Sequence, residues 1–375
     1  MILTLGGQGL NHDRARVLTT LAGTSLSILL VAVQLGMIAG FAEMISGAID
    51  HAQAGLWIVP PGTAAFDDSS KLGMDARYAA LQVAGVAKVS PVVVGFAEWR
   101  TRAQHTATVV VIGAESKDGA LAPWNVRQGN LNGLDLEGGV VVDTSYRTQL
   151  GIDRLGERAV VENVPVRVVA LSSGIRSFTT SPYLFTSLGT AREILGLSAS
   201  HATYLLVKLA DRADTNRVRT RLTEVLPRLE ILTTDEFRRR NLSRWLLETG
   251  AGAALLGGAL LGFLVGCVIV TQTLHASIRE NIKQLATLRA MGASDAFMAG
   301  TVACHAALNT GLAALLAATF CLGLAWLSSD AALPIHLSKS LTLVLAVLVC
   351  AMSTFAALAA LRKVLKLEPV EVLAQ

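Results

Sequence analysis

Four long stretches of this chain contain no Asp, Glu, Lys or Arg, and they constrain its fold more than any other feature. They cover residues 17–42, 249–278, 296–329 and 340–361, which are 26, 30, 34 and 22 residues long. A helix needs ~20 mainly apolar residues to cross the hydrocarbon core of a bilayer. The sequence therefore predicts an α-helical membrane protein with four transmembrane helices, one before a large polar block and three after it.

A cleaved signal peptide is the alternative interpretation of the first stretch. An Ala-x-Ala spacing exists at Ala52 and Ala54, but Glu43 and Asp50 separate it from the apolar residues. The stretch also exceeds the apolar length of about 7–15 residues that is usual for signal peptides. We therefore expect a retained transmembrane helix.

The polar block, residues 43–248, is 206 residues long and is large enough for one or two folded domains. It holds 23 of the 32 basic residues and 22 of the 28 acidic ones, so its net charge is 23 − 22 = +1. It contains no basic stripe with interleaved aromatic residues. The block is therefore not expected to bind nucleic acid.

The short segments beside the apolar stretches carry most of the basic excess of the chain. They contain Arg14, Arg16, Arg279, Lys283, Arg289, Arg362, Lys363 and Lys366. The positive-inside rule places such segments in the cytoplasm. We expect a multi-pass protein of the bacterial inner membrane, with both termini cytoplasmic and the large block periplasmic.

These expectations divide the chain into nine segments. They are a cytoplasmic segment 1–16, transmembrane helix 17–42, periplasmic domain with stalk helices 43–248, transmembrane helix 249–278, cytoplasmic coupling segment 279–295, transmembrane helix 296–327, periplasmic loop 328–340, transmembrane helix 341–361 and cytoplasmic tail 362–375.

Short β-rich runs alternate with helical patterns inside the polar block, which predicts an α+β domain. Strands are expected at 56–61, 88–100, 107–114, 138–143, 159–171 and 202–210, and helices at 75–83, 186–195 and 213–226. Stalk helices are expected at both ends, over 41–54 and from a cap at Thr233 or Thr234, with Glu236 close behind. Trp245 and Arg244 suit the membrane interface.

Motifs for catalysis, nucleotide binding and metal binding are absent. There is no P-loop, HExxH motif, GxSxG turn or GxGxxG after a strand, and the seven histidines have no ligand spacing. The Ser-rich segment Leu171–Ser177 is interpreted as a turn rather than as the site of a nucleophile. We expect no catalytic residue, no metal and no cofactor in this chain.

The segment His275–Ser294 predicts an amphipathic helix after the second membrane helix. Its basic and apolar positions predict either a connector lying on the membrane surface or a docking helix for a cytoplasmic protein. The candidate coupling residues are Arg279, Glu280, Lys283, Leu285, Leu288, Arg289, Met291 and Gly292.

Two segments resemble the FtsX-like, or MacB-type, ABC transporter permeases. They are "ATLRAMGAS" in the cytoplasmic loop and "LRKVLKLEPVEVL" after the last apolar stretch. The layout of one helix, a large outer block and three helices is similar to that family. "ATLRAMG" and the opening "NHDRARVLTTLAG" resemble its DevC-like branch most, and Gln284-Leu285-Ala286 replaces the frequent Glu-Ile-Gly.

The resemblance implies a non-catalytic permease subunit that works with a separate ABC ATP-binding subunit, which would bind ATP and magnesium. It also implies a homodimer, a MacB-like periplasmic core domain, and mechanical transmission from the cytoplasm to that domain. A DevC-like member is expected to export a lipid, lipoprotein or other hydrophobic cargo with a periplasmic membrane-fusion adaptor and a TolC-like outer-membrane channel. Two alternatives are an FtsX-like regulator of a cell-wall hydrolase and an ATP-independent sensor or adhesin.

Two patterns inside the apolar stretches repeat every four residues. Small residues at Gly250, Ala254, Gly258, Gly262 and Gly266 allow close helix contact, either with another helix of the same chain or at a dimer seam. Thr301, His305 and Asn309 form a polar stripe, with His305 roughly 10–15 Å inside the bilayer. A hydrogen bond within the bundle is the simpler reading of the stripe, and a proton or substrate path is the alternative.

Overall fold

The structure is a computed structural model that describes residues 14–68, 70–101, 106–115, 120–152, 154–179, 181–280, 294–327 and 339–364. The chain divides into two compact units. We call Phe41–Gly250 the sheet unit, and residues 1–40 with 251–375 the helical unit.

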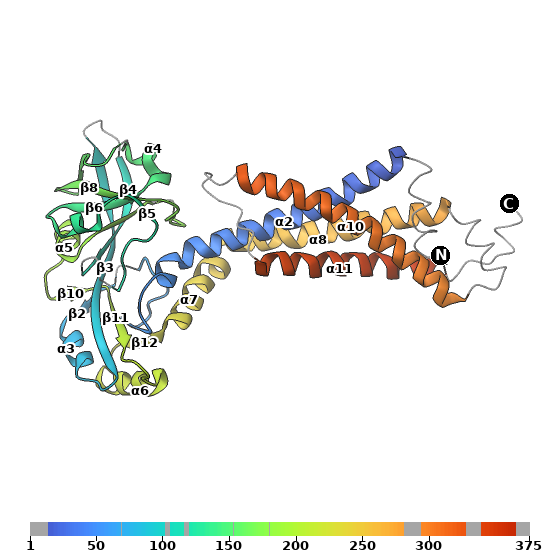
Figure 1. Ribbon diagram of the computed structural model, residues 1–375. Helices are drawn as coiled ribbons and strands as arrows, with labels where there is room; N and C mark the ends of the chain where they lie inside the picture. Colours follow the sequence, from blue (N-terminus) through green and yellow to red (C-terminus); the bar gives the residue numbers. More distant parts are fainter. Residues whose placement is uncertain are drawn as a thin grey trace, which may run out of the picture. The chain divides into compact units, whose positions relative to one another are not determined.

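Long apolar helices make up the described part of the helical unit (Figure 1). They are α2 (Arg14–Asp50, of which residues 41–50 belong to the sheet unit), α8 (Gly250–Glu280), α10 (Asp295–Leu327) and α11 (Lys339–Val364). By length and composition α2, α8 and α10 can each cross a membrane, whereas the apolar part of α11 is the shorter stretch Leu341–Phe355. The count of four spans therefore stays a prediction.

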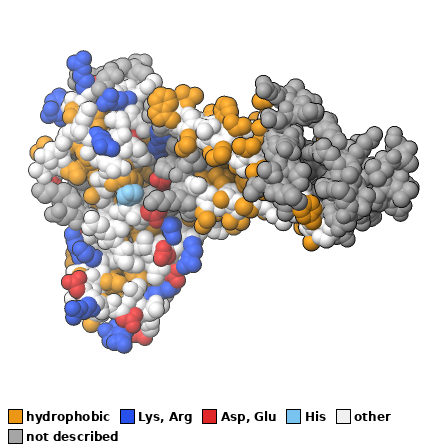
Figure 2. Space-filling model, turned by 45° about the vertical axis from the view of Figure 1, so that its right-hand side comes forward, with side chains coloured by type: hydrophobic (Ala, Val, Ile, Leu, Met, Phe, Trp, Pro, Cys, Tyr) orange, Lys and Arg blue, Asp and Glu red, His pale blue; other side chains and the backbone are white. Residues whose placement is uncertain are grey.

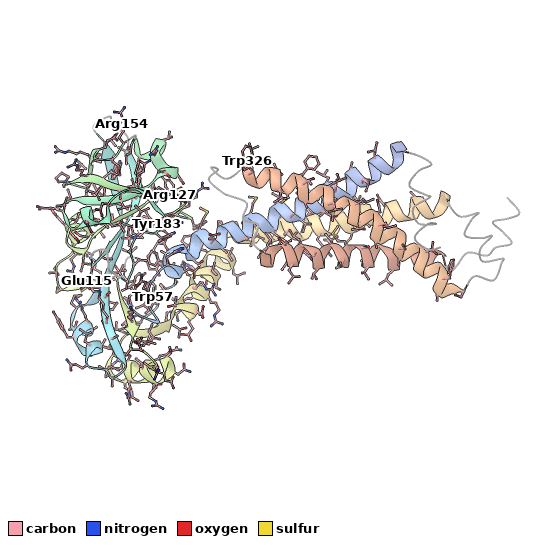
Figure 3. The ribbon with its side chains drawn as sticks, viewed as in Figure 1. Trp57, Glu115, Arg127, Arg154, Tyr183 and Trp326 are labelled. Atoms are coloured by element: carbon pink, nitrogen blue, oxygen red, sulfur yellow. The ribbon has the colours of Figure 1, made fainter. Side chains whose placement is uncertain are left out.

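Large apolar side chains project outward from these helices. Leu260 on α8, Leu315 on α10 and Leu343 on α11 are each more than half exposed, and Trp326 is 81% exposed and points away from the helices (Figure 3). Figure 2 shows hydrophobic side chains gathered on the described helices, whereas charged side chains are spread over the sheet unit. Contiguous exposed apolar surface of this kind marks contact with lipid or with another protein.

The sheet unit has an α+β fold. Its strands are β1 (Leu56–Val59), β2 (Leu72–Gly73), β3 (Val86–Thr101), β4 (Thr106–Ala114), β5 (Val126–Gly129), β6 (Gly139–Asp143), β7 (Arg158–Val161), β8 (Val164–Ser172), β9 (Tyr183–Ser187), β10 (His201–Ala202), β11 (Tyr204–Leu209) and β12 (Glu230–Thr233). Its other helices are α3 (Asp75–Leu81), α4 (Arg147–Leu150), α5 (Leu188–Ile194), α6 (Thr215–Val225) and α7 (Thr234–Ser243), with short turns η1 (Leu131–Asp135), η2 (Thr144–Tyr146) and η3 (Arg244–Glu248).

Ten strands form one sheet, in the order β12-β1-β11-β3-β4-β9-β6-β8-β5, with β7 pairing both β3 and β8. Because β7 joins β8 back to β3, the six strands β3, β4, β9, β6, β8 and β7 form a closed ring. The 16-residue β3 also pairs β11 through its first half, so it runs from the open part of the sheet into the ring.

Three apolar clusters support the sheet, and one of them, which includes Trp57 of β1 and Phe185 of β9, spans both parts. Residues from β3, β4, β6, β7 and β8, including the fully buried Trp99, form the core of the ring. The helices α3 and α6 pack their apolar faces against the open part, where Leu56, Leu205 and Leu222 are completely buried.

Every predicted strand and helix of the block is present, with three differences. The expected strand 159–171 is a hairpin of β7 and β8 that turns at Glu162, whose φ is 53°. The sequence does not predict β2, β5, β9, β10 and β12. The second stalk does not run as one α-helix into α8, because the chain at Thr249 is extended (φ −97°, ψ 149°).

Candidate functional site

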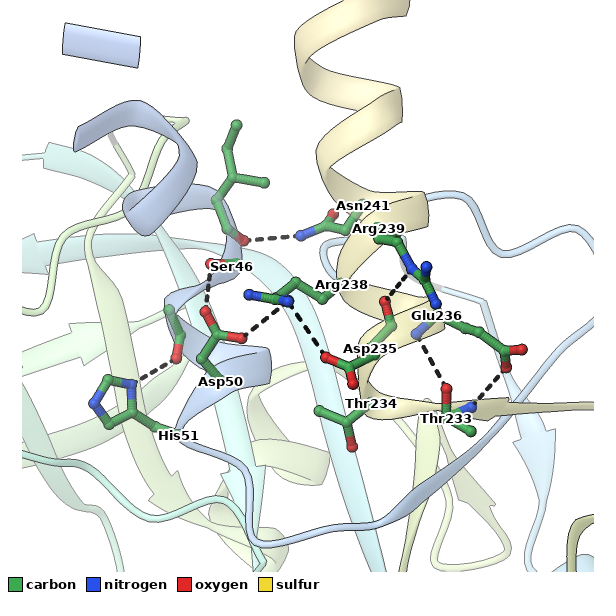
Figure 4. A network of polar contacts seen from close by, with 12 residues as sticks. Ser46, Asp50, His51, Thr233, Thr234, Asp235, Glu236, Arg238, Arg239 and Asn241 are labelled. Atoms are coloured by element: carbon green, nitrogen blue, oxygen red, sulfur yellow. Dashed lines mark hydrogen bonds and ion pairs between the residues drawn. The ribbon is translucent and has the colours of Figure 1, made fainter. Parts of the chain in front are cut away.

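The candidate functional site is the place where the two stalks, residues 41–50 of α2 and the helix α7, meet the sheet. We call it the stalk junction (Figure 4). It consists of residues 41–50 of α2, the helix α7, and the loop 173–182 between β8 and β9. All three segments lie within the sheet unit.

A capping box starts α7. The amide of Glu236 donates to the Thr233 hydroxyl over 3.2 Å, and the amide of Thr233 donates to the Glu236 carboxylate over 3.0 Å. The hydrogen bond from the Thr233 amide lowers the pKa of Glu236, and Arg219, 2.8 Å from the carboxylate, lowers the pKa further. The predicted cap at Thr233 is therefore confirmed.

Trp57 on β1 ties the first turn of α7 to the chain that follows α2. Its indole donates to the Thr234 hydroxyl over 3.2 Å, and that hydroxyl donates to the carbonyl of Ala54 over 2.6 Å. The completely buried Phe237 lies against Trp57, with ring centroids 5.0 Å apart. Figure 3 shows Trp57 inside the sheet unit. Aromatic contacts of this kind bury large apolar areas and fix the orientation of α7.

Asn241 connects the two stalks directly. Its side-chain amide donates to the carbonyl of Ile45 on α2 over 2.8 Å, and its carbonyl oxygen accepts the amide of Phe66 over 3.1 Å. The side chain is almost completely buried, at 1% exposure. A buried amide with its donor and acceptor both satisfied holds three segments in one register.

A group of charged side chains, Arg238, Asp50 and Asp235, lies near Asn241 (Figure 4). Arg238 on α7 lies 3.7 Å from Asp50 at the end of α2 and 3.3 Å from Asp235. The Ser46 hydroxyl donates to Asp50 over 2.5 Å. Because these groups are partly exposed, they contribute less than the buried Asn241 amide.

Phe178 in the β8–β9 loop lies between the two stalks. Its ring centroid is 4.4 Å from that of Phe41 on α2 and 4.5 Å from that of Trp245 in η3. The ring of strands therefore contacts both stalks through one aromatic side chain.

Buried polar groups anchor the loop that carries Phe178. The carboxylate of Asp143, 1% exposed, accepts the Ser172 hydroxyl and the Ile175 amide, each over 2.8 Å. The Tyr146 hydroxyl accepts the amide of Ser177 over 2.9 Å. Leu171 and Ser172 belong to the end of β8, and hydrogen bonds hold the irregular chain that follows. Ser172 takes part in this structure by donating to Asp143.

The chain leaves the junction through a π-helical turn, η3, which joins α7 to α8. Within it, Trp245 contacts Phe178, and Arg244 pairs with Glu248 over 2.5 Å. The expected position of Arg244 and Trp245 at the membrane interface stays a prediction. Single π-helical turns inside helices occur frequently at functional sites.

The predicted coupling residues lie at or beyond the limit of the described chain. Arg279 and Glu280 are the last two residues of α8, and nothing is described of their side chains. Lys283, Leu285, Leu288, Arg289, Met291 and Gly292 lie outside the described residues. Their role stays a prediction.

The small residues that repeat every four positions on α8 pack against other helices of the same chain over part of α8. A Cβ atom at Gly258 would lie 2.9 Å from Gln34, and one at Gly262 would lie 3.2 Å from Leu30, both on α2. One at Gly266 would meet Met352 on α11 and lie 3.2 Å from Ser27. Gly250 and Ala254 are exposed. The dimer seam stays a prediction.

The polar stripe lies on α10. Thr301 donates to the carbonyl of Phe297 over 2.9 Å, so its hydroxyl is satisfied within the helix. Asn309 is buried, at 4% exposure, and its Nδ2 atom has no hydrogen-bond partner among the described residues. Nothing is described of the His305 side chain. The functional alternative for the stripe therefore stays a prediction.

The stalk junction is the part of the site that we did not predict. Asn241 joins segments that are 175 and 196 positions away in sequence, and Phe178 contacts two other distant segments. Short-range patterns carry no such information. One available signal was Phe178 itself, a large aromatic residue in a Ser- and Thr-rich loop. Among the described residues, no group of three or more His, Cys, Asp or Glu side chains could hold a metal ion.

Two protein families match the chain, and together they cover most of it. The family described as MacB-like periplasmic core domain matches residues 17–225, and the one described as FtsX-like permease C-terminal matches residues 256–369. None of the curated proteins that were compared matches the chain.

Three solved structures are similar to about half of the chain. The periplasmic region of MacB from Actinobacillus actinomycetemcomitans has 15% identity and a TM-score of 0.39, covering 50% of this chain and 93% of that one. The extracellular domain of the noncanonic ABC-type transporter YknZ from Gram-positive bacteria has 12% identity and a TM-score of 0.35, covering 48% and 99%. A domain of a putative permease protein from Porphyromonas gingivalis has 13% identity and a TM-score of 0.33, covering 48% and 89%.

Proposed function

The chain belongs to the FtsX-like, ABC-type permeases with a MacB-like periplasmic core domain, and from this premise we propose that it transmits ATP-driven motion to that domain. Members of this family are permease-type subunits of the inner membrane with a periplasmic domain. Membership of the family implies an ABC ATPase as partner. In our proposal the stalk junction receives the motion on the periplasmic side.

The bond between Asn241 and Ile45 is the observation that carries the proposal. It joins the two stalks inside the sheet unit, and Trp57 and Phe178 attach the same stalks to the sheet and the ring. A movement of either stalk relative to the sheet would break buried hydrogen bonds or separate packed aromatic rings. Each buried polar group left without its partner costs about 1–3 kcal/mol. The sheet unit is therefore built to move as one body.

On the cytoplasmic side, the proposal assigns the coupling role to residues 279–293. The apolar positions expected in this segment would fill a groove of the ATP-binding subunit. That partner binds ATP and magnesium. Two permease copies would form a homodimer, and both termini would lie in the cytoplasm.

Export of a lipid, lipoprotein or other hydrophobic cargo, in the manner of the DevC-like branch, is the role that we favour. The periplasmic adaptor and TolC-like outer-membrane channel belong to that part of the proposal. Control of a cell-wall hydrolase uses the same motion and needs no channel.

The experiment follows the sheet unit while the partner hydrolyses ATP. The four cysteines of the full chain are replaced by alanine, and the exposed Arg217→Cys is introduced for a spin label. The protein is purified with its ABC ATP-binding subunit and placed in nanodiscs. We expect the distance between labels on two permease copies to change when ATP and vanadate are added. Unchanged distances during continued ATP hydrolysis would contradict the proposal.

The same sample separates export from hydrolase control. A periplasmic adaptor and a cell-wall hydrolase of the same organism, each purified alone, are added in separate experiments. Only the true partner should raise the rate of ATP hydrolysis. If the hydrolase raises the rate of ATP hydrolysis and the adaptor does not, the function is control of the hydrolase and not export.

A further inference from the structure

Trp124, in the loop between β4 and β5, packs against the end of α2. Its indole stacks on the imidazole of His51, with ring centroids 4.1 Å apart and an angle of 4° between the ring planes. His51 is itself held to the helix, because its Nδ1 atom lies 2.9 Å from the carbonyl oxygen of Gly47 (Figure 4). A Cβ atom added at Gly47 would lie 3.6 Å from the same indole. Trp124 therefore covers the last turn of α2 from Gly47 to His51.

The same indole also contacts the ring of strands. Trp124 meets Phe185 on β9 edge to face, with ring centroids 5.7 Å apart. The carbonyl of Asn125, the next residue, accepts the amide of Ser173 in the β8–β9 loop over 3.1 Å. The loop that carries Trp124 is therefore fixed to the ring, while its indole lies on α2.

The ring contacts α2 at a second place, where Phe178 lies against Phe41. Phe41 and His51 are ten positions apart, which is about 15 Å along a helix. A single contact fixes one point of a helix and leaves the helix free to turn about that point, whereas two separated contacts also fix its direction. The contacts of Phe178 and Trp124 together therefore set the direction of α2 relative to the ring.

Other contacts hold the stalks to the sheet unit as a whole. Ala48 and Ile49 of α2 are completely buried in the apolar cluster that spans both parts of the sheet. Arg240 of α7 pairs with Glu230 on β12 over 2.6 Å, in the open part. Because these contacts remain without Trp124, its loss should loosen the ring relative to α2 without unfolding the sheet unit.

We propose that Trp124 is the positioning residue through which α2 steers the ring of strands. When α2 tilts, the indole passes the movement of the last turn to β9 and to the β8–β9 loop, so the ring turns with the helix. Without the indole, the ring keeps the contact at Phe178 and turns about it. The inference rests on the proposed function, because it concerns the movement that reaches the periplasmic domain.

Spin labels within one chain test the positioning role with no ATPase present. The four cysteines are replaced by alanine, and labels are attached through Glu43→Cys on α2 and Arg158→Cys on β7, which are both exposed positions. Labelled chains are diluted with unlabelled ones in nanodiscs, so that only distances within a chain are measured. We expect a narrow distance distribution that Trp124→Ala broadens. An equally narrow distribution in Trp124→Ala would overturn the proposal.

Two further variants keep the test decisive. His51→Ala removes the stack from its exposed side, so it should broaden the distribution in the same way even if Trp124→Ala unfolds. Tyr78→Ala, which removes an aromatic side chain that is 67% exposed on α3, should leave the distribution narrow. Equal effects of His51→Ala and Tyr78→Ala would contradict the role given to Trp124.

The ATP-driven movement separates a positioning role from a merely structural one. In the complex with the ATP-binding subunit, a label at Arg158→Cys reports the ring and a label at Arg217→Cys reports the open part. On addition of ATP and vanadate, we expect Trp124→Ala to lose the distance change between the ring labels of two copies and to retain the change in the open part. Retention of both changes would refute the steering role. If neither label moves in the chain that keeps Trp124, the proposed function fails, and the distances within one chain still decide the role of Trp124.

Discussion

The Nδ2 atom of Asn241 on α7 lies 2.8 Å from the carbonyl oxygen of Ile45 on α2, in a position that is closed to solvent. The two residues are 196 positions apart and belong to the stalks that lead to different membrane helices. One buried hydrogen bond therefore fixes the separation of the stalks where they enter the sheet.

Replacing Asn241 with alanine should destabilise the sheet unit by about 3 kcal/mol, because the carbonyl of Ile45 and the amide of Phe66 both lose their partner in a buried place. Thermal unfolding followed by circular dichroism measures the loss. Asn216→Ala on the exposed face of α6 is the control and should change the stability by less than about 0.5 kcal/mol. Equal effects of the two variants would contradict the role given to Asn241.

Replacing Phe178 with alanine should detach the ring of strands from the stalks. Two aromatic contacts, each worth about 0.5–1.5 kcal/mol beyond buried area, disappear. We expect faster hydrogen exchange in residues 243–249 and in the first turn after Phe41, with little change in β6. Phe178→Tyr, which keeps the ring, should restore slow exchange.

The capping box should make stability depend on pH. The hydrogen bond from the Thr233 amide lowers the pKa of Glu236 below its ordinary value of 4.5. The contribution of the ionised Glu236 to the stability of the fold is therefore complete above that value. The contribution is lost as the pH falls through the lowered pKa, because the folded state must then bind a proton that the unfolded state already holds.

Glu236→Gln checks this dependence. Since the side chain is about one-third exposed, we expect a loss of only about 0.5 kcal/mol at neutral pH. Denaturant unfolding of both proteins over a range of pH should show the difference shrinking in acid. A difference that grows as the pH falls would reverse the assigned sign.

Two glycines on α8 allow a comparison between the face that packs against α2 and a face that contacts no other part of the described chain. Gly262→Leu should disrupt the contact with α2, where Leu30 and Val31 already lie within 3.4 Å of an added Cβ atom. Gly257→Leu meets nothing within 4 Å and should be tolerated. Melting temperature and yield in detergent report the result. A lower melting temperature for Gly257→Leu than for Gly262→Leu would contradict the packing of this face against α2.

Charge reversal in the cytoplasmic loop tests the coupling segment. The double variant Arg279→Glu and Arg289→Glu should reduce co-purification of the ATP-binding subunit by about tenfold or more, which corresponds to about 1.4 kcal/mol. Lys363→Glu, a reversal in the predicted cytoplasmic tail, should leave co-purification intact. Unchanged recovery of the double variant would remove these residues from the interface.

The local elements of the fold were predictable because short-range physics determines them. Runs such as Leu56–Val59 and Thr106–Ala114 are β-rich and form the expected strands, and Thr233 with Glu236 forms the expected cap. The apolar stretches form long helices because a chain in lipid must satisfy its backbone hydrogen bonds internally.

The assembly of these elements was not predictable in the same way. The strand β9 contains only Tyr183–Ser187 and lacks alternation, yet it completes the ring by pairing β4 and β6. The break at Thr249 follows a sequence that is compatible with a helix, and Trp245, four residues earlier, packs against Phe178. Both outcomes depend on contacts between distant segments.

The ring of six strands has a mechanical consequence. A strand at the edge of an open sheet can be peeled away one hydrogen bond at a time, but a strand in a closed ring has neighbours on both sides. A load that enters through Phe178 must therefore act on several ladders of hydrogen bonds together. Under tension the ring of strands should be the last part of the sheet unit to yield, and the turn at Thr249 the first.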